Sequence, residues 1–163
     1  MGEMDVKVGI GDLNLVSSPI KIMTIGLGSC VGISLFDKRK KIVGLSHIML
    51  PDSTQFKEVK NPFKFADLAI PILIKKMEEI GCTRRDITAK IVGGASMFKF
   101  SDKRIISDIG ERNVEMVKDI LLNVERIPIV AQETGGSKGR TIIVNPDDGL
   151  VTVRTIGEEI MII

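Results

Sequence analysis

The chain has 163 residues, of which 44% are hydrophobic and 27% charged, and its formal net charge at pH 7 is +2. This length and balance are typical of one globular domain, so we expect a single domain over residues 1–163. The near-neutral charge and the absence of Trp and Tyr argue against a nucleic-acid-binding protein, which needs a basic face and aromatic stacking platforms.

Charged residues interrupt every apolar run well before the length that a transmembrane helix needs, and residues 1–7 contain no apolar signal-peptide core. We therefore expect a cytoplasmic protein that does not insert into a membrane. Two cysteines and one histidine are too few for a tetrahedral zinc site, so we expect no metal. No organic cofactor is expected either, because Val31 stands where the dinucleotide fingerprint requires Gly or Ala.

Short apolar runs dominate the N-terminal half and are typical of β-strands. They cover residues 7–10, 20–25, 31–36 and 42–49. The last two flank the polar segment 37–40, which predicts a β-hairpin. The hairpin ends before Pro51, because proline cannot donate a hydrogen bond to a β-ladder.

A helix is predicted over residues 62–80, with Pro62 near its start and Gly81 just past its end. Apolar residues at three- and four-residue spacing would form its buried face: Ala66, Ala69, Ile70, Leu73, Ile74 and Met77. Pro71 lies inside this pattern and should kink or split the helix.

The remaining elements are further strands and one more helix. The sequence predicts a strand at 87–92, a helix at 109–124, a strand at 127–132, and a hairpin of strands at 141–144 and 150–156. This order predicts an α+β fold with two main helices over a mostly antiparallel sheet, and it leaves a second sheet layer open.

Cys30 and His47 lie at the two ends of the first hairpin, and His47 is the only histidine. If Asp37 pairs with Lys40 across the turn, the same register places Cys30 directly opposite His47. A neighbouring imidazole can take the thiol proton, and the thiolate is the reactive nucleophile. Thr24, on the preceding strand, could orient the imidazole through its second nitrogen. The spacing therefore predicts a catalytic dyad, on condition that the hairpin has this register.

The loop before Cys30 fits the same chemistry. Gly26 and Gly28 let the chain turn with positive φ just before the cysteine. The backbone N–H groups of Ser29 and Cys30 are then candidates for an oxyanion hole. Structural interpretations stay open, since Cys30 alone is also typical of an inert buried thiol and His47 alone of a structural histidine.

At these residues the sequence resembles the CheD family, the chemoreceptor glutamine deamidases of bacterial and archaeal chemotaxis. The matching stretches run in order along most of the chain, at residues 24–30, 44–53, 65–67, 93–98, 109–113 and 133–136. The chain departs from the family's usual pattern at Phe65, where members carry Tyr, and in segments 54–60 and 99–107.

The resemblance implies a three-layer α/β/β sandwich and a catalytic triad that maps onto Cys30, His47 and Thr24. It also implies the reaction of a protein-glutamine glutaminase, without a metal or organic cofactor. Cys30 would attack the side-chain carboxamide of a glutamine on a chemoreceptor (a methyl-accepting chemotaxis protein), ammonia would leave, and water would hydrolyse the thioester to glutamate. Deamidation would tune receptor signalling.

The resemblance implies a second partner, a CheC-type phosphatase of the chemotaxis response regulator. We expect Ala95, Ser96, Met97 and Phe98 to contribute to the partner-binding surface. Two alternatives remain. A non-catalytic adaptor that binds and stimulates the phosphatase would not need the thiol, and a cysteine protease or transglutaminase would share the dyad.

Overall fold

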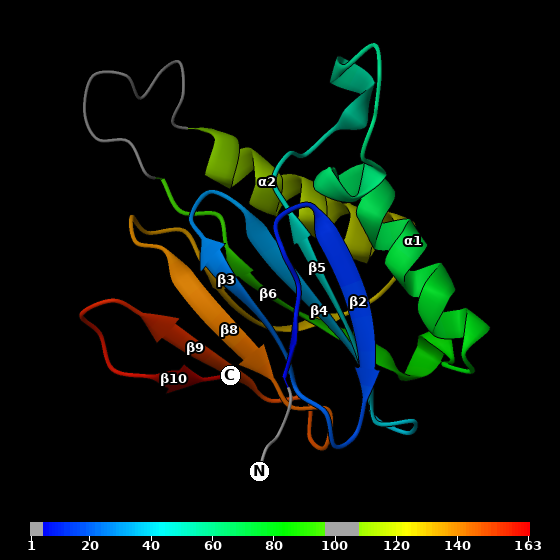
Figure 1. The fold of residues 1–163 in the computed structure, drawn as a ribbon. Helices are drawn as coiled ribbons and strands as arrows, with labels where there is room; N and C mark the ends of the chain where they lie inside the picture. The colour runs from blue at the N-terminus through cyan, green and yellow to red at the C-terminus, as the bar shows by residue number, and fades with distance from the viewer. Residues whose placement is uncertain (1–4, 97–107) are drawn as a thin grey trace.

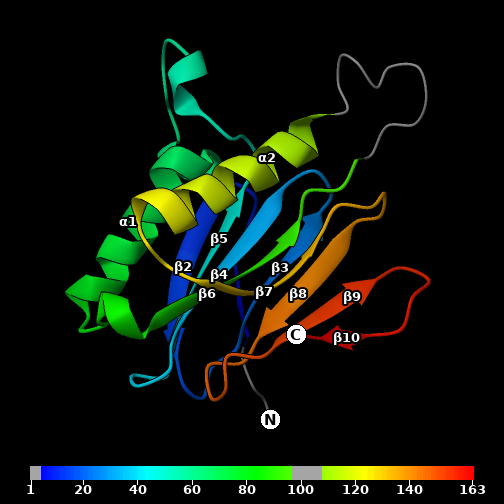
Figure 2. The same cartoon turned by 180° about the vertical axis from the view of Figure 1, so that it is seen from behind.

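Two helices lie across one face of a five-stranded sheet, and a second five-stranded sheet covers the other face (Figure 1). The view from behind shows the same three layers (Figure 2). The computed structural model describes residues 5–96 and 108–163. Within these ranges most strand pairings are antiparallel. The prediction of an α+β fold with α/β/β layers, mostly antiparallel sheets and two main helices is confirmed.

The central sheet has the strand order β2-β5-β4-β6-β7, and the outer sheet has the order β1-β3-β8-β9-β10. The central strands are β2 (Asp12–Ser17), β4 (Val31–Asp37), β5 (Ile42–Ile48), β6 (Ile87–Gly93) and β7 (Ile129–Thr134). The outer strands are β1 (Val6–Lys7), β3 (Ile22–Leu27), β8 (Arg140–Val144), β9 (Val151–Thr155) and β10 (Met161–Ile162). The sequence pattern missed two of these strands, β2 and β10.

Helix α1 (Ala66–Glu79) buries the six apolar residues that the spacing predicts. It begins four residues later than expected, because a 3-10 turn occupies Pro62–Lys64. Pro71 does not split it, since Ile70 and Ile74 on either side pack fully buried against the sheet and hold the helix together. Helix α2 (Asp108–Asp119) continues as a π-helix over Ile120–Val124. Neither helix, as far as residues 5–96 and 108–163 describe them, has the length and apolarity of a membrane span.

Strand alternation divides the apolar side chains between two cores. One core lies between the helices and the central sheet and contains Ile33, Leu35 and Leu73. The other lies between the two sheets and contains Leu45 and Ile142. Strand β5 is buried along its whole length, because it lies in the central sheet with a layer on each side.

The predicted register of the β4–β5 hairpin is wrong by two residues. Asp37 pairs with Ile42 and not with Lys40, so His47 lies opposite Gly32. The Asp37 carboxylate accepts hydrogen bonds from the backbone N–H groups of residues 39 and 40, at 2.9 and 3.0 Å, and this local turn keeps both residues out of the ladder. Lys41 then takes a left-handed backbone, with φ 56°, before β5 begins.

Strand β3 contains an irregularity that reverses its alternation. Thr24 and Leu27 are both fully buried, although they are three residues apart, while Ile25 and Gly26 between them are exposed. The register with β8 shifts between Thr24 and Leu27, as expected for a β-bulge. The bulge therefore lets both residues face the interior.

Candidate functional site

Thr24, Cys30 and His47 all adjoin the space between the two sheets, where Thr24 and His47 are in hydrogen-bond contact. His47 is on β5, and its alternation places it on the same face as Leu45, which belongs to the core between the sheets. Cys30 immediately precedes β4 and packs against the same core. Thr24 reaches this space from β3 in the outer sheet. The sandwich thus brings the three residues from separate strands to one layer.

The corrected register changes how Cys30 and His47 face each other. Gly32 takes the position opposite His47, and Cys30 lies two residues before Gly32 on the same face. The cysteine and the histidine are therefore diagonal and not direct neighbours, which in a regular ladder separates their Cα atoms by about 7–8 Å. Because Gly32 carries no side chain, no Cβ stands across from the imidazole on the β4 side, whereas Asp12 is the direct neighbour of His47 on the β2 side.

A chain of hydrogen bonds fixes the imidazole. The Thr24 hydroxyl donates to the carbonyl oxygen of Val8 at 2.6 Å, and the same hydroxyl oxygen lies 2.6 Å from His47 Nδ1. Since the hydroxyl has already given its only proton, Nδ1 must be the donor in the second bond. This assigns the proton to Nδ1 and leaves the lone pair on Nε2. Among the described residues Nε2 has no partner, so it is ready to accept a proton.

The Cys30 thiol and the His47 imidazole are both uncharged at neutral pH. Burial lowers the pKa of His47 from 6.5 to about 4. Burial also raises the pKa of the Cys30 thiol, and the contact of the sulfur with its own backbone N–H offsets only part of this effect. The candidate site therefore holds a neutral thiol and a neutral imidazole, and a nucleophilic role for this thiol would require a base.

The loop that carries Cys30 differs from its prediction at one glycine. Gly26 has the expected left-handed backbone, with φ 77°, whereas Gly28 is not among the glycines with positive φ. Gly28 is held instead by its carbonyl, which accepts from the N–H of Ala95 at 2.8 Å. Among the described residues no backbone carbonyl accepts from the N–H of Ser29 or Cys30. Both N–H groups therefore stay candidates for an oxyanion hole.

A double-glycine turn after β6 supports this loop from behind. Gly94 donates its N–H to the carbonyl of Cys30 at 2.8 Å. Gly93 has φ 120°, and a Cβ at that position would lie 2.2 Å from the Cys30 carbonyl oxygen. Only glycine allows this approach. The turn thus has a supporting role beside Cys30 as well as ending a strand.

The sequence prediction missed two buried polar residues around this loop. Asn113, on α2, donates from Nδ2 to the carbonyls of Ser29 and Met49, at 2.9 and 3.1 Å. Arg140, on β8, donates from Nη1 to the carbonyl of Gly93 at 3.3 Å. A signal for Asn113 exists in the sequence: it shares the four-residue spacing of Val117 and Leu121, which marks a polar residue on the buried face of a helix.

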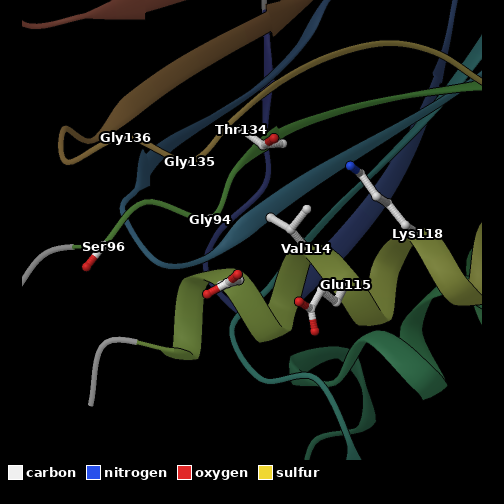
Figure 3. A pocket seen from close by; sticks show the side chains of 9 residues that line it. Gly94, Ser96, Val114, Glu115, Lys118, Thr134, Gly135 and Gly136 are labelled. Atoms are coloured by element: carbon white, nitrogen blue, oxygen red, sulfur yellow. The ribbon is translucent and has the colours of Figure 1, made fainter. Parts of the chain in front are cut away.

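A pocket of 490 Å³ opens on the other side of the double-glycine turn, between α2 and the loops that follow β6 and β7 (Figure 3). Its lining residues are Gly94, Ser96, Glu111, Val114, Glu115, Lys118, Thr134, Gly135 and Gly136. Of the residues predicted to bind partners, Ser96 lines this pocket and Ala95 is fully buried. Met97 and Phe98 lie outside the described residues.

The second cysteine lies in a different environment. Cys82 is buried in the core on the helix side of the central sheet. Burial, together with the neighbouring Asp37 carboxylate, raises the pKa of its thiol to about 12. Cys82 is therefore protonated and shielded at neutral pH, and Cys30 is the better candidate for a reactive thiol.

Comparison with known proteins places this chain in a family. Residues 49–155 match the family model described as CheD chemotactic sensory transduction. A protein of Clostridium botulinum (strain Eklund 17B / Type B) is 65% identical over 157 residues, which cover 96% of each chain. A protein of Clostridium novyi (strain NT) is 57% identical over the same length and the same shares. Both are named "Probable chemoreceptor glutamine deamidase CheD".

A solved structure, the Bacillus licheniformis hypothetical protein YfiH, superposes with a TM-score of 0.45 at 15% identity, covering 77% of this chain and 51% of that one. The two Clostridium proteins are far more similar to this chain in sequence than YfiH is. The family match begins after Thr24, Cys30 and His47, but the match to the Clostridium botulinum protein leaves at most six of the 163 residues outside and so spans all three positions. On the family model and these near-full-length relatives together, the chain belongs to the CheD family of chemotactic sensory transduction proteins.

Proposed function

We propose that this protein deamidates glutamine side chains of chemoreceptors in the cytoplasm, with Cys30 as nucleophile, His47 as general base and acid, and Thr24 as the residue that orients His47. The observation that carries the proposal is the buried Thr24–His47 bond, which leaves Nε2 as an unpartnered acceptor on the sheet face that Cys30 shares. The names of the relatives, probable chemoreceptor glutamine deamidases, supply the substrate class.

The first half of the reaction forms a thioester. The Cys30 thiol gives its proton to His47 Nε2 while the sulfur attacks the carboxamide carbon, and the carbonyl oxygen becomes an oxyanion. The backbone N–H groups of Ser29 and Cys30 donate to this oxyanion. The proton on Nε2 then passes to the amide nitrogen, the C–N bond breaks, and ammonia leaves.

The second half releases glutamate. Water gives a proton to Nε2 and attacks the thioester carbon, and the sulfur leaves and is protonated again as the thiol. The imidazole changes charge only transiently. A lowered His47 pKa suits this role, because an imidazole that is neutral at pH 7 can begin either half of the cycle as a base.

Mass spectrometry of a chemoreceptor signalling-domain fragment tests the function directly. After incubation with the protein, we expect the mass increase of a carboxamide becoming a carboxylic acid at particular glutamines, stoichiometric release of ammonia and an intact backbone. Cleaved fragments would favour a protease, and Gln–Lys cross-links a transglutaminase. An unchanged fragment, with ammonia at the level of a protein-free control, would contradict the proposal.

Thr24→Val should separate orientation from nucleophilicity. Valine keeps the shape but removes both hydrogen bonds, leaving His47 Nδ1 and the Val8 carbonyl buried without partners. We expect kcat to fall about 10- to 100-fold and the free energy of unfolding to fall by about 1–3 kcal/mol. Thr24→Ser keeps the hydroxyl and should recover most of kcat and most of the free energy of unfolding. Ammonia release measures the first quantity and urea denaturation the second. Equal kcat values for Val and Ser would remove Thr24 from the mechanism.

We further propose that a CheC-type phosphatase binds beside the segment 95–98. Ser96 lines the pocket behind the Cys30 loop, so a partner seated there would lie close to the nucleophile and could compete with a receptor. In an adaptor without chemistry, phosphatase binding would be the only activity. The experiment with the receptor fragment decides between a deamidase and such an adaptor.

A further inference from the structure

Each of three successive carbonyl groups in the loop before β4, those of residues 28, 29 and 30, accepts a hydrogen bond from the turn after β6 or from α2. The Gly28 carbonyl accepts from the N–H of Ala95 and the Cys30 carbonyl from the N–H of Gly94, both at 2.8 Å. The Ser29 carbonyl between them accepts from Asn113 Nδ2 at 2.9 Å. Asn113 is the one side chain in this set. The other two contacts come from the backbone of the double-glycine turn.

Holding a carbonyl also aims an N–H group. A trans peptide unit is planar, and its C=O and N–H point in opposite directions. The Ser29 carbonyl and the Cys30 N–H belong to one peptide unit, so the bond from Asn113 turns the Cys30 N–H away from α2. The Cys30 N–H does point at its own sulfur, where it counteracts the rise in thiol pKa caused by burial. An oxyanion formed by attack of that sulfur would develop beside this N–H.

Asn113 also touches the arm of the site that carries the histidine. Its second Nδ2 hydrogen bonds to the carbonyl of Met49 at 3.1 Å, and Met49 follows His47 by two residues. Both acceptors are carbonyl oxygens, so the side-chain amide must present nitrogen and not oxygen to them. The residue is fully buried. One rigid amide on α2 thus joins the loop before Cys30 to the chain leaving β5.

We propose that Asn113 is a positioning residue that aims the Cys30 N–H at the developing oxyanion and fixes the Cys30 loop relative to the end of β5. The inference rests on the proposed function, since it presumes acyl transfer to Cys30. A purely structural asparagine would lower every reaction of the thiol alike when lost. A residue that organises the oxyanion hole affects acyl transfer far more than alkylation, because alkylation forms no oxyanion.

The experiment compares two reactions of the same thiol in the full-length chain. The first is acylation by p-nitrophenyl acetate, followed as a burst of p-nitrophenolate. The second is alkylation by iodoacetamide, followed by mass spectrometry at Cys30. Asn113→Ala should slow acylation about 10- to 100-fold while alkylation, measured at high pH where the thiolate is formed, stays within about twofold. The readout is the rate of acylation divided by the rate of alkylation.

Asn123→Ala is the matched control. Asn123 lies on the π-helical continuation of α2 and is exposed. Within the described residues its side chain forms a hydrogen bond only with the side chain of Asp119. Its loss should leave the ratio unchanged. If Asn113→Ala does not fold, Asn113→Ser keeps a donor of smaller reach and should lower the ratio to an intermediate value. An unchanged ratio in the folded variant, or the same drop in Asn123→Ala, would overturn the inference.

The outcome is separable from that of the proposed function. p-Nitrophenyl acetate needs no receptor, so the ratio can be measured even if no receptor glutamine is deamidated. Conversely, Cys30→Ala should remove the burst completely. A burst that survives in Cys30→Ala would show that another group is acylated and would refute the assignment of the nucleophile itself.

Discussion

Cys30→Ala should abolish glutamine deamidation and leave the fold intact. The variant removes the atom that forms the thioester, and loss of a nucleophile in comparable hydrolases lowers kcat by a factor on the order of 10⁴ or more. Cys30 is only partly buried at the start of a strand, so we expect the free energy of unfolding to change by less than about 1 kcal/mol. Ammonia release from a receptor fragment measures the first effect and urea denaturation the second.

Cys82→Ala is the control for Cys30→Ala. Cys82 lies on the opposite side of the central sheet, and its buried thiol bonds to Asp37. Its removal should cost some stability and leave the deamidation rate of the folded protein unchanged. Activity that persists in Cys30→Ala and disappears in Cys82→Ala would reverse the assignment of the nucleophile. Phosphatase binding that persists in Cys30→Ala would separate the docking surface from the chemistry.

His47→Gln should reduce deamidation strongly at neutral pH and much less at high pH. The raised pKa of the Cys30 thiol means that the sulfur is protonated at pH 7, and in the proposed mechanism it depends on His47 for activation. Loss of a general base costs about 10²–10⁴ in rate. As the pH rises toward the thiol pKa, the thiolate forms without the imidazole as base. The wild-type rate divided by the variant rate should therefore fall toward 1.

The acidic side of the wild-type pH profile should report His47 itself. Protonation of Nε2 removes the base, and the lowered pKa places this loss near pH 4 and not near 6.5. The rate should therefore stay level from pH 7 to about pH 5. Initial rates across pH 4–10 for both proteins, with circular dichroism to confirm folding, give the result. A constant ratio at every pH would exclude His47 as the base.

The features predictable from the sequence are those encoded by local periodicity. The buried stripe of α1 follows from three- and four-residue spacing alone, and all six predicted residues are buried. Strand β2 was missed because it is an edge strand whose exposed positions carry Asp12, Asn14 and Ser17, residues typical of turns. Strand β10 has only two residues, both exposed, and so carries no burial pattern.

The placement of Cys30 and His47 was predictable to the level of the sheet face but not of the register. An offset of two residues keeps Cys30 and His47 on one face, so the prediction that they share a layer survived the error in the hairpin. The register depended on whether Asp37 would close a turn with its carboxylate, which a run of basic residues does not indicate. The contacts of Asn113 with two distant carbonyls depend on tertiary packing, so no local pattern encodes them.

The bulge in β3 makes the backbone conformation between Thr24 and Leu27 decisive for the site. Ile25 and Gly26 face away from the interior, yet they let Thr24 reach the imidazole and Leu27 fill the core beneath the loop. Across a separation of three residues plain alternation would turn either the hydroxyl or the leucine outward, so only the bulge keeps both inside. Gly26 carries a left-handed backbone within this bulge, with φ 77°, so variation at this position should be confined to residues that tolerate positive φ, such as glycine and asparagine.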